Sequence, residues 1–271
     1  MVTTNIARTD DGTIQINFSI PKIDIDKAQE AAISELAKDV TLPGFRKGKA
    51  PLDKAKEKID AGRLLEKTLG KILPEAYTKV LTDNKIRPII YPKFEILKQG
   101  ETWEVQAKVA ELPEVELGDF KNLVGGAIRA ELLKKELTKE EKEQVAIKAL
   151  LASTKVKIPK IIIDEEVNAR LSGLLARIEK LGLQLESYLA SIGKDEKTLR
   201  EEYEKQIAEG ISLELILNKI ADEQKLEIPD SEIDAAVKAS GTKGPVNDEQ
   251  RILVKSVLKR RAALDQLITI S

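Results

Sequence analysis

The chain has 271 residues, enough for one large domain or two of ordinary size. It contains no Cys and no His, which excludes disulfides, zinc sites of the usual type and His-based acid–base catalysis. Charged residues make up 34% of the chain but its net charge is only −1, so any strong charge must be a local excess. The N-terminus lacks an apolar leader segment and no apolar run is long enough to span a membrane, so a cytoplasmic protein is expected.

The first elements along the chain are a hairpin and a helix. Apolar and polar side chains alternate over residues 13–20, which indicates a half-buried strand. A turn signal before this strand makes residues 3–8 its predicted hairpin partner. Asp24 or Asp26 would cap a helix that runs to about Val40.

A longer helical pattern follows over residues 64–81, where Pro74 is expected to kink or divide the helix. Three shorter elements complete this half: a helix over residues 52–59, and strands over residues 94–96 and 103–109. The order strand–strand, helices, strand–strand over residues 1–118 is typical of an α+β domain.

The second half is predicted to be all-helical. We expect a linker at residues 119–130, where Gly125 and Gly126 interrupt a weak periodicity. Residues 131–271 then form an all-α domain with an aliphatic core. Its helices are expected near residues 131–153, 160–181, 185–192, 195–224, 230–240 and 248–268.

The residue inventory disfavours an enzyme. There is no Gly-rich phosphate loop that opens a helix, and a serine nucleophile has no His partner. Adjacent carboxylates such as Glu140 and Glu141 fall in first turns of predicted helices, where they favour the helix dipole. No catalytic residue, metal ligand or cofactor is therefore expected.

The most distinctive segment is Gly44-Phe45-Arg46-Lys47-Gly48-Lys49. Residues 44–58 carry six Lys or Arg against two acidic residues, a local balance of +4. An aromatic residue and adjacent cations between glycines suit a loop that docks into an anionic, partly apolar partner. The alternative is a helix–helix connection that merely turns in solvent, with Phe45 folded back as a small cap on the core. The residues alone leave both interpretations open.

The same segment, extended to Leu42 and Pro51, resembles the signature loop of trigger factor, the bacterial ribosome-associated chaperone. Residues 86–92 and 110–117 resemble the end of that family's N-terminal domain, and residues 158–166, 199–202 and 215–221 resemble its C-terminal helical domain. The family commonly carries an FK506-binding-type prolyl isomerase domain between these parts. This chain has only a short stretch there, so isomerase activity is not implied.

The resemblance implies an α+β ribosome-binding domain followed by an all-α chaperone domain with helical arms. The ribosome-binding residues would be Gly44, Phe45, Arg46, Lys47, Gly48 and Lys49. Arg46 and Lys47 would meet ribosomal RNA phosphate or an acidic side chain of a ribosomal protein, and Phe45 would fill an apolar notch. The implied partners are the ribosome and nascent or unfolded polypeptides, with no membrane; the family can also form homodimers off the ribosome.

Three functional hypotheses follow. The first is an ATP-independent holding chaperone at the ribosomal exit site, without isomerase activity. The second is a ribosome- or RNA-binding factor whose helical domain recruits a protein partner. The third is a periplasmic chaperone with the same helical architecture, which the missing signal peptide and the otherwise idle loop disfavour.

Overall fold

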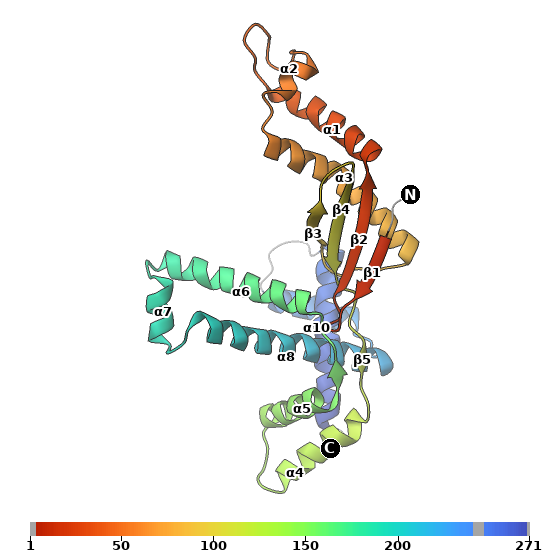
Figure 1. Ribbon diagram of the computed structural model, residues 1–271. Coiled ribbons are helices and arrows are strands. Elements are labelled where there is room, and N and C mark those ends of the chain that lie inside the picture. Colours follow the sequence, from red (N-terminus) through yellow and green to blue (C-terminus); the bar gives the residue numbers. More distant parts are fainter. Residues whose placement is uncertain (1–3, 241–246, 270–271) are drawn as a thin grey trace. The chain divides into compact units, whose positions relative to one another are not determined.

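The computed structural model describes residues 4–240 and 247–269 (Figure 1). The chain divides into two compact units, Met1–Leu112 (unit 1) and Pro113–Ser271 (unit 2). The division lies six residues before the end of the α+β segment expected from the sequence, so residues 113–118 belong with the helical part.

Unit 1 is built on an antiparallel sheet with the strand order β1-β2-β4-β3. Its strands are β1 (Thr4–Arg8), β2 (Ile14–Pro21), β3 (Lys93–Lys98) and β4 (Thr102–Val109). Phe18 lies opposite Val105 and Ile16 opposite Ala107, so the apolar residues of both central strands share one face. All four are buried there. The predicted hairpin is confirmed from Thr4 onward; residue 3 lies outside the described residues.

Helices cover the apolar face of this sheet (Figure 1). They are α3 (Ala61–Asn84) and the first half of α1 (Lys22–Leu36), whereas the 3₁₀ turn η1 (Ala37–Asp39) and α2 (Leu52–Lys56) follow α1 and contribute no residue to this core in the described part of the chain. Ile72 and Tyr77 of α3 pack into the core with the strand residues. Pro74 lies inside α3 without dividing it, because the packed face of the helix offsets the one hydrogen bond that proline removes.

The predicted cap of the first helix is wrong. The helix begins at Lys22, directly after Pro21, and no side chain caps it. Pro21 is in extended backbone, with φ −67° and ψ 151°, and as a proline it has no backbone N–H that would be left without a partner at the helix start. Asp24 consequently lies in the first turn, where its charge favours the helix dipole.

Unit 2 is mainly helical, as expected. Its helices are α4 (Phe120–Leu132), α5 (Lys139–Ser153), α6 (Lys160–Lys180), α7 (Leu185–Ser191), α8 (Glu196–Glu223), α9 (Asp230–Ala239) and α10 (Asp248–Thr269). Two short strands, β5 (Val115–Glu116) and β6 (Lys155–Val156), pair antiparallel and depart from the all-α expectation. None of the helices in the described residues combines the length and apolarity that crossing a bilayer would need.

The linker predicted at residues 119–130 is instead helix α4. Phe120, Val124 and Ile128 recur at the four-residue spacing of one helix face and are all buried in the core of unit 2. Two glycines in a helix cost about 2 kcal/mol in propensity relative to alanine. Burial of three large side chains is worth more than that, so tertiary packing overrides the local signal.

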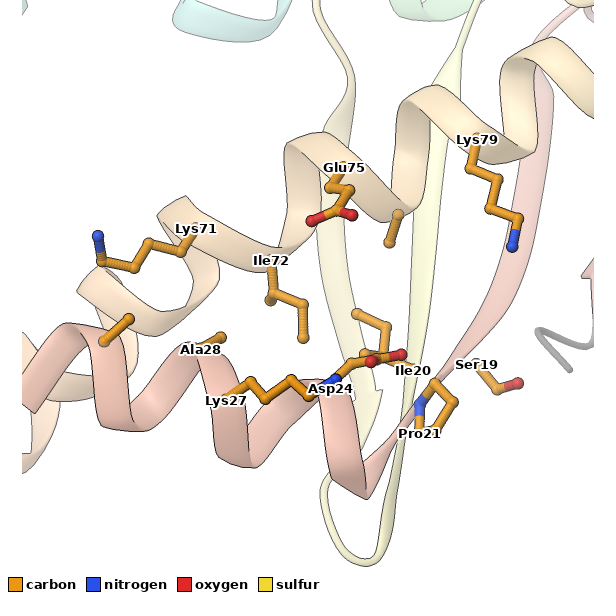
Figure 2. A pocket seen from close by; sticks show the side chains of 12 residues that line it. Ser19, Ile20, Pro21, Asp24, Lys27, Ala28, Lys71, Ile72, Glu75 and Lys79 are labelled. Atoms are coloured by element: carbon orange, nitrogen blue, oxygen red, sulfur yellow. The ribbon is translucent and has the colours of Figure 1, made fainter.

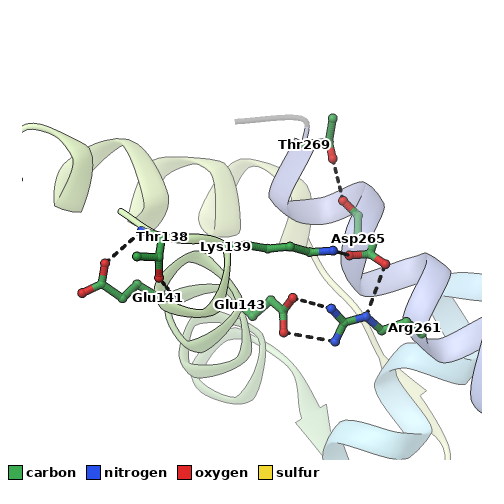
Figure 3. Close-up of polar contacts among 7 residues, drawn as sticks. All are labelled: Thr138, Lys139, Glu141, Glu143, Arg261, Asp265 and Thr269. Atoms are coloured by element: carbon green, nitrogen blue, oxygen red, sulfur yellow. Dashed lines mark hydrogen bonds and ion pairs between the residues drawn. The ribbon is translucent and has the colours of Figure 1, made fainter. Parts of the chain in front are cut away.

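The helix predicted over residues 131–153 is also divided. α4 ends at Leu132 and α5 begins at Lys139 with a capping box (Figure 3). The Thr138 hydroxyl accepts from the Glu141 backbone N–H at 3.2 Å, and the Glu141 carboxylate accepts from the Thr138 backbone N–H at 2.9 Å. These two bonds satisfy donors at the helix start and fix the boundary.

α4, α5, α8 and α10 share the core of unit 2. Ion pairs at the edge of this core join α5 to α10 (Figure 3). The Arg261 guanidinium donates to both carboxylate oxygens of Glu143, at 2.6 and 3.1 Å. Lys139 lies 2.7 Å from Asp265 and lowers the pKa of that carboxyl group. The polar contacts thus fix how the two helices lie against each other at the rim of the core.

The α6–α7–α8 segment forms an arm that projects from the core of unit 2 (Figure 1). We call it the α6–α8 arm, and its tip comprises residues 181–195. Arg200 of α8 contacts Asn168 at 3.0 Å and Asp164 at 3.3 Å on α6. Arg170 lies over the ring of Tyr203, 4.4 Å from its centre. The arm therefore has contacts of its own, both polar and cation–π, and buried apolar side chains such as Val167 and Leu199 that do not belong to the four-helix core.

Candidate functional site

The segment singled out in the sequence connects η1 to α2. α1 carries the chain away from the sheet over 15 residues, about 22 Å at the helical rise (Figure 1). α3 then returns alongside α1 to the sheet. The segment therefore lies at the end of unit 1 that is remote from the sheet.

The segment folds as two successive tight turns, and we call residues 42–49 the double-turn loop. In the first turn the Phe45 N–H donates to the Leu42 carbonyl at 3.1 Å, with Pro43 second and Gly44 third. Gly44 has φ +82°, the value that a type II turn requires at its third position. In the second turn the Lys49 N–H donates to the Arg46 carbonyl at 2.9 Å.

Gly48 holds the base of the double-turn loop closed. It has φ +73° and occupies the third position of the second turn. Its N–H donates to the Val40 carbonyl at 3.2 Å. A Cβ atom at this position would lie 2.7 Å from the Lys38 carbonyl oxygen, so only glycine fits without displacing backbone.

Phe45 does not fold back as a cap on the core. It is 38% exposed and is not among the described core residues of unit 1. The Lys54 ammonium of α2 lies 5.6 Å from the centre of its ring, within cation–π distance. The ring is thus presented at the surface with one neighbouring cation from the next helix.

The cations of the double-turn loop differ in their surroundings. Lys47 lies 3.3 Å from Asp39 of η1, and both side chains are largely exposed. Arg46 and Lys49 are exposed, and no ion pair to either is found within the described part of the chain. Because exposed pairs are worth at most about 1 kcal/mol, Lys47 can exchange Asp39 for another anion at little cost.

Further cations lie on α3 where it packs against α1. Lys67 and Lys71 lie 2.6 and 2.9 Å from the two carboxylate oxygens of Glu35 on α1. Hydrogen bonds from these lysines lower the pKa of Glu35 to about 2. Glu35 therefore stays charged at neutral pH and joins α1 to α3 just before the double-turn loop begins.

The structure thus brings all six predicted site residues into one short loop. Sequence reasoning missed Asp39 and Lys54 as neighbours of Lys47 and Phe45. The basic run that contains Lys54 was visible in the sequence, but its contact with the ring depends on how α2 packs.

A separate groove of about 520 Å³ lies between α1 and α3 (Figure 2). Glu75 of α3 points toward α1, while Asp24 and Lys27 line the α1 side. Lysines and carboxylates alternate around small apolar side chains, without the apolar enclosure typical of small-molecule sites. In the described residues no group of three acidic, His or Cys side chains is arranged to hold a metal ion.

Exposed apolar side chains gather at the tip of the α6–α8 arm. Leu181 is 73% exposed, and Leu183 and Ile192 are exposed as well. None of the three belongs to the described core of unit 2. The tip of the arm therefore exposes three large apolar side chains within twelve residues of the chain.

Comparison with known proteins gives consistent matches along the chain. The family model described as "Bacterial trigger factor protein (TF)" matches residues 2–150, and the model described as "Bacterial trigger factor protein (TF) C-terminus" matches residues 118–269. Trigger factor of Streptococcus mutans is 36% identical over 110 residues, which cover 40% of this chain and 26% of that protein. Trigger factor of Streptococcus pyogenes serotype M1 is 37% identical over 111 residues, with the same shares.

The fold has a counterpart among solved structures. A chain from the work described as "Promiscuous Substrate Recognition in Folding and Assembly Activities of the Trigger Factor Chaperone" superposes with a TM-score of 0.70 at 15% identity. The superposition covers 98% of this chain and 100% of that chain, and at this identity it shows a shared fold. The matched segment spans about a quarter of the length of the curated relatives. The two matched parts overlap, and no FK506-binding-type domain lies between them in the described residues. Because each family model matches more than half of the 271 residues, the chain belongs to the bacterial trigger factor family of chaperones.

Proposed function

We propose that this chain is an ATP-independent chaperone that docks at the ribosomal exit site through the double-turn loop and holds nascent or unfolded polypeptides with unit 2. It would then act in the cytoplasm and would not catalyse prolyl isomerisation. The observation that carries the proposal is the double-turn loop itself, which presents Phe45 beside Arg46 and Lys49 on a backbone fixed by two glycine turns.

The proposed ribosome contact has a polar and an apolar part. Arg46 can bind phosphate or carboxylate in bidentate fashion, while Lys49 contributes a point charge. Phe45 contributes an apolar ring whose desolvation is favourable in any matching notch. Lys47 would exchange its surface partner Asp39 for ribosomal anions. This combination suits ribosomal RNA together with an acidic ribosomal protein surface better than either alone.

The proposed client contact lies on the α6–α8 arm. A holding chaperone needs apolar contacts that are shallow and adaptable, since its clients share no sequence. Leu181, Leu183 and Ile192 offer such contacts because they are exposed on a tip outside the core. This arrangement supports weak binding of many apolar segments rather than tight binding of one.

Ribosome docking is tested by changing Phe45, Arg46 and Lys47 together to Ala. We expect ribosome binding to weaken by at least about 100-fold, because two charge-assisted contacts and an apolar anchor are lost. Co-sedimentation with purified ribosomes at several salt concentrations measures this. The parent chain should lose affinity steeply as salt rises, as phosphate contacts require.

The control changes Lys22 and Lys27 to Ala, which removes two exposed charges from the first turns of α1, the end of that helix away from the loop. Its ribosome affinity should stay close to that of the parent. Circular dichroism spectra of all three chains should coincide. Undiminished binding by the triple variant would contradict the site, and a flat salt response would indicate a mainly apolar contact.

A further inference from the structure

The exposed aromatic ring of the double-turn loop needs a physical explanation. Phe45 is 38% exposed, and an isolated phenyl ring on a glycine-flanked loop gains by collapsing onto any apolar surface nearby. The ring does not collapse onto the core of unit 1, as far as the described residues show. Something near the loop therefore has to fix the ring in an outward position.

Lys54 is placed to do this. Its ammonium lies 5.6 Å from the centre of the Phe45 ring, inside the range over which a cation is attracted to an aromatic face. Lys54 is exposed and has no ion pair within the described residues, so the ring is the contact that the structure gives it.

Both partners of this contact stand on backbone that is fixed independently. The Phe45 N–H is bonded within the first turn of the double-turn loop. On the other side, α2 packs against α1 and η1, and Ala55, next to Lys54, is fully buried. The contact between ammonium and ring is therefore made between two pre-positioned groups, which lowers the entropy that docking would otherwise cost.

We infer that Lys54 is a positioning residue of the docking loop, which holds the Phe45 ring from the α2 side and leaves its remaining surface for an apolar notch bordered by negative charge on the ribosome. This inference rests on the docking role proposed above. Lys54 acts in two ways: it orients the ring, and it adds a cation beside it. Together with Arg46 and Lys49, it makes the surroundings of the ring positive.

Lys56 provides a matched control within α2. It is exposed, carries the same charge and lies two residues away, but makes no ring contact among the described residues. Lys54→Met and Lys56→Met therefore remove equal charge and leave an unbranched side chain that is one atom shorter in both cases. Only Lys54→Met removes the cation from the ring. Lys54→Arg keeps a cation that can stack on the ring.

The experiment measures dissociation constants for purified ribosomes with the full chain, in the parent and in a Phe45→Ala background. We expect Lys54→Met to weaken binding about two- to five-fold more than Lys56→Met, and Lys54→Arg to restore most of the affinity. In the Phe45→Ala background the two Met variants should weaken binding equally. If Lys54→Met and Lys56→Met weakened ribosome binding equally in the parent as well as in the Phe45→Ala background, the inference would be overturned. Lys54 would then act only through its charge.

A second measurement does not require ribosomes. In the free chain with carbon-13-labelled Phe, the ring signals of Phe45, assigned through Phe45→Ala, should move in Lys54→Met and stay in place in Lys56→Met. If the parent chain failed to bind ribosomes, the proposed function would fail while these signals still decided whether Lys54 fixes the ring. Ring signals that are unchanged in Lys54→Met would refute the positioning role directly.

Discussion

At the scale of single residues, the loop depends on two glycines in left-handed backbone. Gly44 and Gly48 both have positive φ, each as the third residue of a tight turn. They differ in their surroundings: a Cβ on Gly44 would meet nothing within 4 Å, whereas on Gly48 it would lie 2.7 Å from the Lys38 carbonyl oxygen. The two positions therefore separate backbone strain from steric conflict.

Alanine at these glycines should reveal the difference. We expect Gly44→Ala to lower the free energy of unfolding by about 1 kcal/mol, the usual penalty for left-handed backbone in an L-residue. Gly48→Ala should cost at least about 2 kcal/mol, because the clash with the Lys38 carbonyl is added. Urea unfolding followed by circular dichroism gives both values.

The control for this pair is Gly100→Ala. Gly100 lies in the β3–β4 connection without positive φ, and a Cβ there meets nothing within 4 Å. Replacing Gly100 by Ala should change the free energy of unfolding by less than about 0.5 kcal/mol. If Gly48→Ala changed the free energy of unfolding as little as Gly100→Ala does, the base of the double-turn loop would be able to move freely.

At the scale of elements, the α6–α8 arm and the four-helix core of unit 2 use different contacts. The core is held by apolar side chains of α4, α5, α8 and α10. The arm has buried apolar side chains of its own, such as Val167 and Leu199, and contacts such as Arg170 with Tyr203. Its apolar tip can consequently be changed without removing side chains from the core.

Polar substitutions at the tip test whether it holds clients. Leu181→Ser, Leu183→Ser and Ile192→Thr together should weaken client binding on the order of tenfold, since partial burial of three apolar side chains is lost. Suppression of aggregation of an unfolded reporter protein by the full chain measures this. Helix content should not change, because the three side chains lie outside the described core.

The matching control changes Gln184 and Glu186 to Ala, which removes two exposed polar side chains from the same tip. It should suppress aggregation as well as the parent does. Full activity of the apolar-tip variant would place the client contact elsewhere in the chain. No suppression by the parent itself would favour the alternative role of a ribosome- or RNA-binding factor that recruits a protein partner.

At the scale of the whole molecule, the chain has two units with separate cores, and the division along the sequence falls between Leu112 and Pro113. The two family models overlap over residues 118–150, so they leave no unmatched segment between the N-terminal and C-terminal parts. The family's isomerase domain, where present, lies at this junction. Its place here is taken by a direct passage from one unit to the next.

We accordingly expect the chain not to accelerate prolyl isomerisation. In a protease-coupled peptide assay the rate should equal the uncatalysed rate, which is set by a barrier of about 20 kcal/mol. A known prolyl isomerase at equal concentration serves as the positive control. Rate acceleration that persists after repeated purification would reveal an isomerase site in the described units.

The comparison of prediction and structure follows the same scales. The sequence predicted β2 and β4 because one face of each is buried and the other is only partly buried, which produces a clear alternation of apolar and polar residues. It misplaced α4 because Gly125 and Gly126 are strong local signals, while the burial of Phe120 and Ile128 depends on distant helices. Local signals are reliable where tertiary contacts agree with them and fail where packing outweighs them.

The sequence by itself determined the order of the strands and α-helices in unit 1, the lack of thiol and imidazole chemistry, and the concentration of positive charge around Phe45 and Arg46. These properties follow from the composition and from the spacing of residues along the chain, which do not depend on how the chain folds. Only the tertiary structure decided that Phe45 stays outside the core, that Lys47 pairs with Asp39, and that Lys54 covers the ring. Such contacts join residues whose distance is set by how η1, α2 and the two glycine turns pack, and no local pattern encodes that distance.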